Sequence, residues 1–288
     1  MNGFVNILKP TGYTSSDVVV KVRKSLSKEL GYKVKVGHMG TLDPYGTGVL
    51  PLAIGTATKL FDYLIGGQKT YLAGITLGKE TDTLDSYGEI VKTDSKVFSI
   101  DDINRVLSQN IGEIYQLPPQ YSAKKINGEK AYDIARRGEY VELKKRKVNI
   151  FDITASKGKD INNFDIKVDC SGGTYIRSLV RDIAYSLNTV GYMSYIIRTK
   201  SVGFDIQDSV TFDEFFDSPL DYIIPIEKVI LPLYKSYEIH ENKKALALNG
   251  VKLKLNDMPE GLFVLTFKNQ IIGMAENVEG KLIIKNRL

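Results

Sequence analysis

Residues 37–52 of the chain read GHMGTLDPYGTGVLPL, and the stretch continues as AIGTATKL through residue 60. Five glycines, two prolines and four threonines surround one carboxylate, Asp43, and the stretch also holds His38, one of only two histidines. Glycine and proline at this density predict a backbone that turns sharply and repeatedly rather than continuing a helix or strand. We therefore expect a shaped loop whose only acid is Asp43.

Asp43 has two interpretations. An Asp before Pro commonly opens a turn or caps a helix, and residue types alone favour this structural role. The order of the whole stretch favours a functional role, because Gly-His-x-Gly-Thr-Leu-Asp-Pro followed by Gly-x-Leu-Pro resembles the central motif of the TruB family of tRNA pseudouridine synthases. The resemblance implies that Asp43 is the nucleophile.

The composition bounds the class of protein. The chain has 288 residues, 43% of them hydrophobic and 25% charged, which suffices for one large domain and a small one. Apolar runs stay shorter than the roughly 20 residues that span a bilayer, and the amino terminus lacks a secretory leader, so we expect a cytoplasmic protein. Cys170 is the only cysteine, and Walker, His-Glu-x-x-His and Gly-x-Ser-x-Gly motifs are absent, so we expect no internal disulfide, no structural zinc and no phosphate-loop, zinc-protease or hydrolase chemistry.

The charge is unevenly distributed along the chain. The net charge is +5 and the pI is near 8.9. Residues 124–147 contain nine Lys or Arg against four acids, a local excess of 9 − 4 = +5, whereas residues 204–227 carry seven acids and no Lys or Arg. A protein that faces phosphates on one side would be polarised in this way, although a solvated charged face also accounts for the acidic stretch.

Hydrophobic periodicity predicts alternating strands and helices. The predicted strands cover residues 4–10, 69–78, 89–92, 164–170 and 193–204, with a further one beginning at 114. The predicted helices cover residues 17–30, 58–65, 101–107, with Asp101 as cap, and 176–187.

Tyr71 and Asp85 each have a plain structural interpretation. Tyr71 shares the apolar face of the 69–78 strand and could be a core aromatic, and residues 81–88, TDTLDSYG, read as a hairpin loop. In TruB-type enzymes, however, a Lys-x-Tyr at this place sets the ring against the target base, where the hydroxyl is the candidate for moving a proton. The family's Thr-x-Asp-x-x-Gly element likewise implies that Asp85 helps to hold the active-site network.

Two further motifs resemble the same family. Residues 118–125, PPQYSAKK, precede a spaced Gly, Tyr and Ala-Arg-x-Gly; in the family this segment is a thumb-like arm that grips RNA, so we place an arm at about 118–150 and expect Lys124 and Arg136 to bind RNA. Residues 173–179 read GTYIRSL, and although a surface arginine is the plain interpretation, the resemblance implies that Arg177 pairs with Asp43 and that Tyr175 stacks near the base.

The resemblance covers most of residues 3–204 and departs from the family's pattern only at variable loop places, Met39 and Tyr45, and at Ala184, where Gly is common. It implies an α+β pseudouridine synthase fold with a largely antiparallel central sheet over residues 1–231. Residues 232–288 change to a short helix over 243–248 and four short strands, which resemble a small β-rich PUA-type RNA-binding domain.

The implied reaction breaks the C1′–N1 bond of a uridine and rejoins the sugar to C5 of the base, without net redox or hydrolysis. The resemblance therefore implies that no cofactor or metal is needed. An aspartate is ionised at neutral pH without a helper base, so Asp43 suffices; whether it attacks C1′, adds to C6 or deprotonates the sugar stays open. The uridine must be extruded. The resemblance implies that His38 fills the gap, the alternative being a hydrogen-bonded loop histidine, and we also assign Lys59 to RNA binding. The expected target is uridine 55 of the tRNA T loop, bound by a monomer without a protein partner.

Two other classes of function stay open. One is an RNA-binding or RNA-folding protein on the same fold, and the other is the catalytic subunit of a guide-RNA-directed pseudouridylation complex. The presence of Asp43, Tyr71 and Arg177 together argues against an inactive module. The basic segment at residues 124–147 favours direct gripping of tRNA.

Overall fold

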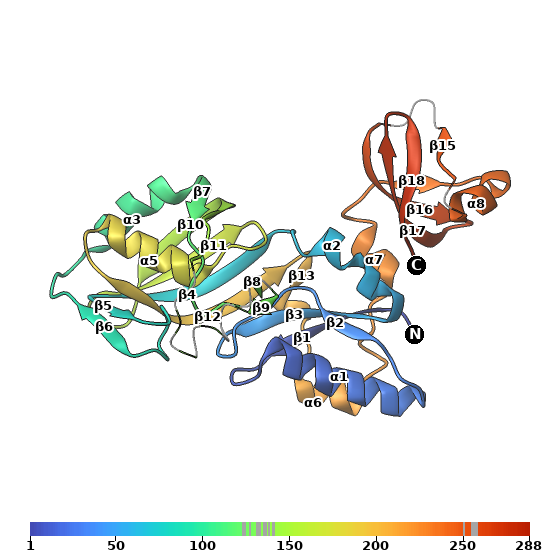
Figure 1. Ribbon diagram of the computed structural model, residues 1–288. Helices are drawn as coiled ribbons and strands as arrows, with labels where there is room; N and C mark the ends of the chain where they lie inside the picture. Colours follow the sequence, from blue (N-terminus) through green and yellow to red (C-terminus); the bar gives the residue numbers. More distant parts are fainter. Residues whose placement is uncertain are drawn as a thin grey trace.

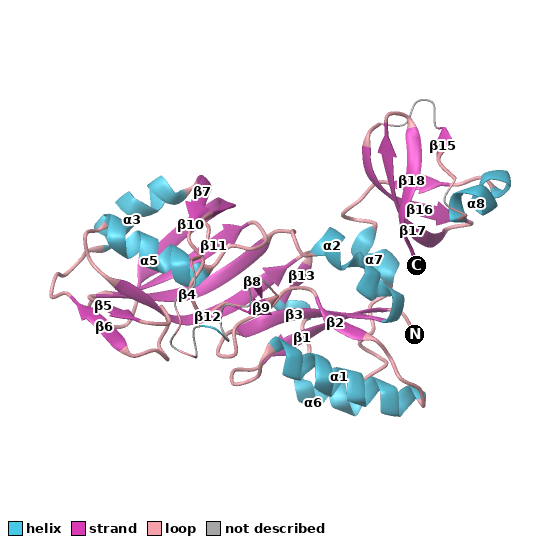
Figure 2. Ribbon diagram, in the orientation of Figure 1, coloured by secondary structure: helices cyan, strands magenta, loops and turns pink. Residues whose placement is uncertain are grey.

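The computed structural model describes residues 1–122, 125–126, 128–130, 134, 137, 139, 142–249, 251–254 and 259–288. These residues form a large elongated body, which contains the amino terminus, and a small β-rich body at the carboxyl end (Figures 1 and 2). The predicted α+β class, with a largely antiparallel central sheet and a small β-rich carboxyl-terminal part, is confirmed.

The large body is built on one mixed sheet. In spatial order its strands are β1 (Gly3–Lys9), β3 (Thr47–Ile54), β12 (Gly191–Ser201), β4 (Lys69–Leu77), β11 (Asn163–Cys170), β10 (Arg146–Lys157) and β7 (Gly112–Gln116), with β2 (Val36–His38) beside β3 and β13 (Phe204–Asp205) beside β12. All neighbours pair antiparallel except β3 and β12, which are parallel. The sheet is therefore largely antiparallel, with one parallel pair.

Helices pack on the two halves of this sheet. Helix α1 (Ser15–Leu30) and helix α6 (Phe212–Asp217) share one buried core with β1 and β3. Helix α3 (Ile100–Leu107) and helix α5 (Ile176–Ser186) share another with β4, β10 and β11. No helix among the described residues is both long enough and apolar enough to cross a membrane.

Shorter elements complete the large body. They are η1 (Gly55–Leu60), α2 (Phe61–Leu64), the pair β5 (Lys79–Thr81) and β6 (Ile90–Thr93), η2 (Ser108–Asn110), the pair β8 (Lys125–Ile126) and β9 (Glu129–Lys130), η3 (Ile206–Asp208) and α7 (Ile226–Ile230).

The small body is a five-stranded sheet with one helix. Its strands are ordered β14 (Ser236–Glu238), β16 (Gly261–Phe267), β17 (Gln270–Val278), β18 (Lys281–Arg287) and β15 (Leu253–Lys254), and its helix is α8 (Glu241–Leu248). Val264 and Met274 of this sheet lie in one buried cluster with Leu60 and Leu64 of the large body, so the two bodies share a core. Gly250, which the sequence pattern makes the stop of α8, lies outside the described residues.

The glycine-rich stretch contains a strand, so the prediction of repeated turning is wrong for its second half. Eight residues, Thr47–Ile54, form β3, and nearly all of them are buried. Pro51 fits because β3 changes its neighbour there, from β12 at Thr47 and Gly48 to β2 at Leu52 onward, and a residue without an N–H is tolerated where a ladder changes partner. Only residues 39–46 form the shaped loop, which we call the Asp43 loop.

Two helix predictions also need correction. The cap of α3 is Ser99 rather than Asp101, because the Ser99 hydroxyl accepts from the Asp102 N–H while the Asp102 carboxylate accepts from the Ser99 N–H. The helix predicted at residues 58–65 is split into a 3-10 turn, η1, followed by the single turn α2.

Lys9, the last residue of β1, is fully buried beneath the Asp43 loop. Its ammonium donates to three carbonyls, those of Pro10 and Pro44 at 2.9 Å and that of Gly46 at 2.6 Å. Burial lowers the pKa of Lys9 to about 8, although the nearby Asp43 carboxylate acts in the opposite direction. The fold thus holds this loop through a buried charge, although burying a charge costs free energy.

Gly48 is the contact point of the parallel pair, and its replacement should be costly. Its φ is +104°, and a Cβ there would lie 2.2 Å from the Arg198 carbonyl oxygen. We expect Gly48→Ala to lower the free energy of unfolding by more than about 3 kcal/mol in urea denaturation. Gly31→Ala, at a φ of +71° with no atom near its Cβ, is the matched control and should cost roughly 1–2 kcal/mol. Equal losses in the two variants would contradict the close approach.

The lowered pKa of Lys9 predicts a pH dependence of stability. Between pH 8 and 10.5 the unfolded chain holds the lysine proton while the folded chain has released it, so the contribution of Lys9 to the free energy of unfolding must rise with pH. The difference between wild type and Lys9→Met should increase by about 2 kcal/mol from pH 7.5 to pH 10. Urea unfolding of both proteins at the two pH values measures it, and a constant or falling difference would refute the buried charge.

Candidate active site

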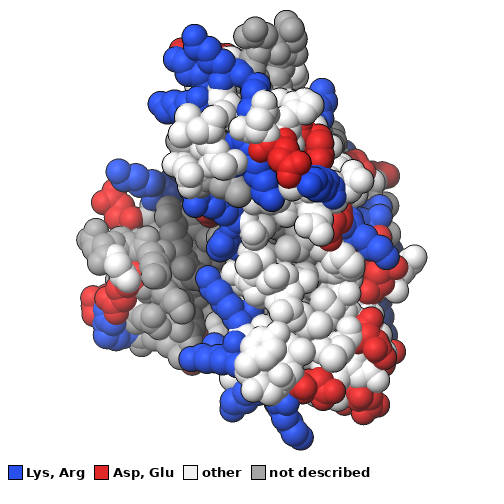
Figure 3. All heavy atoms as spheres, turned by 90° about the vertical axis from the view of Figure 1, so that its right-hand side faces the viewer, with Lys and Arg blue, Asp and Glu red and all other residues white. Residues whose placement is uncertain are grey.

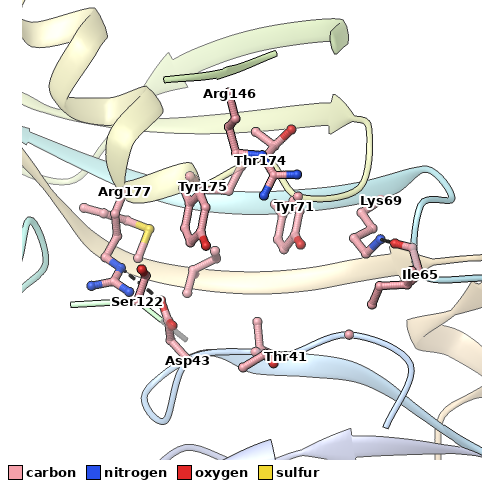
Figure 4. A pocket seen from close by; sticks show the side chains of 16 residues that line it. Thr41, Asp43, Ile65, Lys69, Tyr71, Ser122, Arg146, Thr174, Tyr175 and Arg177 are labelled. Atoms are coloured by element: carbon pink, nitrogen blue, oxygen red, sulfur yellow. Dashed lines mark hydrogen bonds and ion pairs between the residues drawn. The ribbon is translucent and has the colours of Figure 1, made fainter. Parts of the chain in front are cut away.

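A cavity of about 340 Å³ opens beside the Asp43 loop. Its walls come from the loop, from β4 and from the start of α5, and Figure 4 shows the side chains that point into it. The walls that matter for the chemistry are Asp43, Lys69, Tyr71, Arg146, Tyr175 and Arg177. A cavity of this size lies within the range of about 300–1,000 Å³ that holds small ligands.

Arg177 joins three separate segments of the chain at this cavity. Its Nε lies 3.0 Å from Asp43 Oδ2, and one terminal nitrogen lies 3.4 Å from Asp85 Oδ2. The same nitrogen donates to the Thr83 carbonyl and the other to the Tyr121 carbonyl, at 3.0 and 2.9 Å. The side chain is only 7% exposed, so the interpretation of Arg177 as a surface residue is wrong.

The Asp43 loop is held in shape by donors from below. A buried arginine on β12, Arg198, donates to the carbonyls of Gly40, Thr41 and Val49 at 3.1, 3.2 and 2.7 Å. Together with the Lys9 bonds to Pro44 and Gly46, five carbonyls of one short stretch thus point at two buried cations. Hydrogen bonds from a charged donor are stronger than neutral ones, so this arrangement fixes where the Asp43 carboxylate lies.

Sequence reasoning missed Lys9 and Arg198 as parts of this site. Both lie in strands predicted above, Lys9 in the strand at residues 4–10 and Arg198 in the strand at residues 193–204. The available signal is their position inside apolar strands, where a Lys or Arg is rarely buried unless it has partners.

The aromatic wall of the cavity comes from β4 and from the residue before α5. Tyr71 is 6% exposed, and burial raises the pKa of its phenol, so the hydroxyl stays protonated at neutral pH. Tyr175 is held through its N–H, which donates to the buried Gln116 side chain at 2.8 Å. Figure 4 shows the two rings side by side, across the cavity from Asp43 and Thr41.

Two cations complete the wall, and neither was predicted as a site residue. Lys69, two residues before Tyr71 on the same face of β4, donates to the Ile65 and Gly67 carbonyls, both at 2.9 Å. Burial, followed by the charge of Arg198, lowers the pKa of Lys69 to about 8. Arg146, which the sequence analysis counted only as part of the basic segment, lies so close to Gly173 that a Cβ there would stand 2.1 Å from its guanidinium.

Two of the predicted residues that the structure describes, His38 and Lys59, do not line this cavity. His38 ends β2 and does not line it; burial lowers the pKa of the imidazole. Lys59 lies at the junction of the two bodies, where its ammonium donates to the Arg287 carbonyl at 2.7 Å. Lys124 and Arg136 lie outside the described residues, so their RNA contacts stay predictions.

Comparisons with known proteins identify the family of this chain. Residues 24–176 match the family model described as TruB family pseudouridylate synthase, N-terminal domain. The chain is 41% identical to tRNA pseudouridine synthase B of Caldanaerobacter subterraneus subsp. tengcongensis, with 100% of this chain and 99% of the relative aligned. It is 40% identical to the protein of the same name from Staphylococcus haemolyticus, over 96% of this chain and 92% of the relative.

The fold is also found among solved structures. A Cbf5-Nop10-Gar1 complex contains a chain with a TM-score of 0.73 at 24% identity, and an H/ACA RNP bound to a substrate RNA contains one with a TM-score of 0.71 at 22% identity. Both alignments cover 99% of this chain and 84% of the other, and at this identity they show a shared fold. On the family match and the full-length relatives, this chain belongs to the TruB family of pseudouridylate synthases.

Proposed function

We propose that the protein isomerises uridine to pseudouridine at position 55 in the T loop of tRNA, with Asp43 as the nucleophile. The observation that carries this proposal is the ion pair between Asp43 and Arg177 at the wall of a cavity with two tyrosines. The relatives aligned over nearly their whole length are named tRNA pseudouridine synthase B, which supports tRNA as the substrate.

The geometry suits attack by one oxygen of the Asp43 carboxylate. Arg177 engages Oδ2, and among the described residues no hydrogen bond or ion pair engages Oδ1. Arg177 thereby orients the carboxylate while leaving one oxygen for the substrate. In each of the three routes open to an aspartate, at C1′, at C6 or at a sugar proton, the C1′–N1 bond breaks, a C1′–C5 bond forms and C5 loses its proton.

Tyr71 is the candidate for passing on that C5 proton: as its hydroxyl oxygen accepts the proton from C5, the hydroxyl releases its own proton to N1 of the uracil or to water. Its hydroxyl is neutral, since burial raises the pKa of the phenol, and its ring lies across the cavity from Asp43 (Figure 4). Tyr175 supplies a second aromatic surface for the extruded base. His38 stays the candidate for filling the gap that the base leaves in the RNA.

We propose that two parts of a single chain bind the folded RNA. We assign catalysis to residues 1–231, with an RNA-gripping arm at about 118–150, and RNA binding to residues 232–288; we expect a monomer acting on cytoplasmic tRNA. In Figure 3, lysine and arginine side chains form a column that runs from top to bottom of the face shown, and many of the acids lie along the right-hand edge of that face, with others at its left edge and near its top. Such a column is suited to a phosphate backbone.

Tritium release from tRNA labelled at uracil C5 tests the proposal. We expect wild type to release tritium, Asp43→Asn to release none, and a transcript with cytidine at position 55 to yield none from that site, because the C5 proton leaves only when C1′ is joined to C5. A wild type that binds tRNA tightly and in a salt-sensitive manner without releasing tritium would refute a stand-alone synthase. It would leave an RNA-folding module or a subunit that needs a guide RNA.

Arg177 should be irreplaceable by lysine. A single ammonium cannot reach Asp43, Asp85 and the Tyr121 carbonyl together, so Arg177→Lys should lower kcat about 10- to 100-fold with a smaller change in KM. The matched control is Arg181→Lys, one turn later on α5, where Arg181 pairs with Asp182 and does not line the cavity. Single-turnover rates of both variants measure the effect, and equal rates would show that the fork geometry is dispensable.

A further inference from the structure

Two turns beside the cavity have the same layout. In each, an aspartate that contacts Arg177 is followed two residues later by a tyrosine: Asp43 precedes Tyr45, and Asp85 precedes Tyr87. The two tyrosine rings are stacked, with their centroids 3.2 Å apart and their planes at 8°. Arg177 thus joins the turns on the inside, and the ring pair joins them on the outside.

The two rings neither pack in the hydrophobic core nor line the cavity, so neither of these accounts for their stacking. Tyr45 is 47% exposed and Tyr87 57% exposed even though each covers one face of the other, and neither lines the cavity. Neither hydroxyl has a hydrogen-bond partner among the described residues. Two exposed aromatic rings that share a stack present their outer faces to solvent next to the proposed nucleophile.

We propose that the Tyr45–Tyr87 stack is a binding platform for an unpaired RNA base, namely a base that neighbours the uridine entering the cavity. This inference rests on the proposed function. Extruding one nucleotide removes the stacking partner of its neighbours, and an aromatic face can replace that partner whatever the base. The platform lies two residues from Asp43, so it is placed for a neighbour of the target and not for the target itself.

The stacked arrangement decides how the base is held. The inner faces of the two rings cover each other, so the base stacks on an outer face and extends the pair to a stack of three. Such contacts depend on the ring and not on the hydroxyl. The site should therefore accept any of the four bases and should survive replacement of either tyrosine by phenylalanine.

The pair could instead hold the Asp43 loop against the Asp85 turn, a role that we call a clamp and that makes a different prediction. Loss of a clamp would lower the catalytic rate whichever nucleotide neighbours the target. A stacking platform acts on affinity, and only while the neighbouring base is present. A double-mutant cycle between the tyrosines and that base separates the two roles.

The cycle uses the full chain and a T stem-loop RNA labelled with tritium at uracil C5 of the target. The protein variants are wild type, Tyr45→Leu/Tyr87→Leu, Tyr45→Phe/Tyr87→Phe and, as an exposed tyrosine outside both turns, Tyr32→Leu. The RNA variants carry an abasic nucleotide on the 5′ or the 3′ side of the target. Dissociation constants and single-turnover tritium release are measured for every combination.

We expect the double leucine variant to bind intact RNA about 5- to 100-fold more weakly than wild type, from the usual strength of base–aromatic stacking. The double phenylalanine variant and Tyr32→Leu should bind as wild type does. With one of the two abasic RNAs, wild type and the double leucine variant should bind equally.

A leucine effect that persists with both abasic RNAs, or one confined to the rate of tritium release, would overturn the platform and leave a clamp. Unchanged binding in the double leucine variant would also overturn it. These results differ from failure of the proposed function, which would appear as no tritium release from wild type with intact RNA.

Discussion

The convergence of five backbone carbonyls on two buried cations is the constraint on which the site depends. A loop that turns so tightly directs its carbonyls inward, and each needs a donor. Lys9 and Arg198 supply donors from β1 and β12, on either side of β3, and in doing so they tie the loop to the sheet. Arg177 forms an ion pair with the side chain of Asp43. The backbone of the loop and the Asp43 carboxylate are therefore fixed by separate cations.

The position of the loop follows from the sheet. Gly48 lets β3 and β12 approach each other closely in the one parallel pair, and the Asp43 loop enters β3 just before that point. The cavity lies at the edge of the core that α3 and α5 cover, because Tyr71, Ile176 and Met193 belong to that core and also line the cavity. None of the small body's described residues lines this cavity, and the small body instead packs against Lys59 and the cluster around Leu60.

Several strands could be placed from the sequence because, like β11 and β12, they alternate between buried and more exposed residues, whereas the sheet that joins them was implied by the resemblance. Strand β10 was missed for a physical reason: its buried residues Val148 and Ile150 are followed by Ile153, and the β-bulge after Ile150 breaks the alternation. The meeting of Asp43 and Arg177 was implied only by resemblance, since spacing cannot bring together residues 134 positions apart. Buried lysines and arginines were overlooked because, without the carbonyls that bind them, their sequence positions suggest solvent.

The long reach of Arg198 has a consequence for how the chain acquires its active form. Its carbonyl partners lie 149 to 158 positions earlier in the sequence. During synthesis the strands β1 and β3 can pair as soon as they emerge, but the loop between β2 and β3 has no Arg198 to close on until some 150 further residues have been made. Contacts of such separation form slowly. Because β12 also lies between β3 and β4, the two halves of the sheet can join only after β12 has been made, so the sheet and the Asp43 loop are completed together.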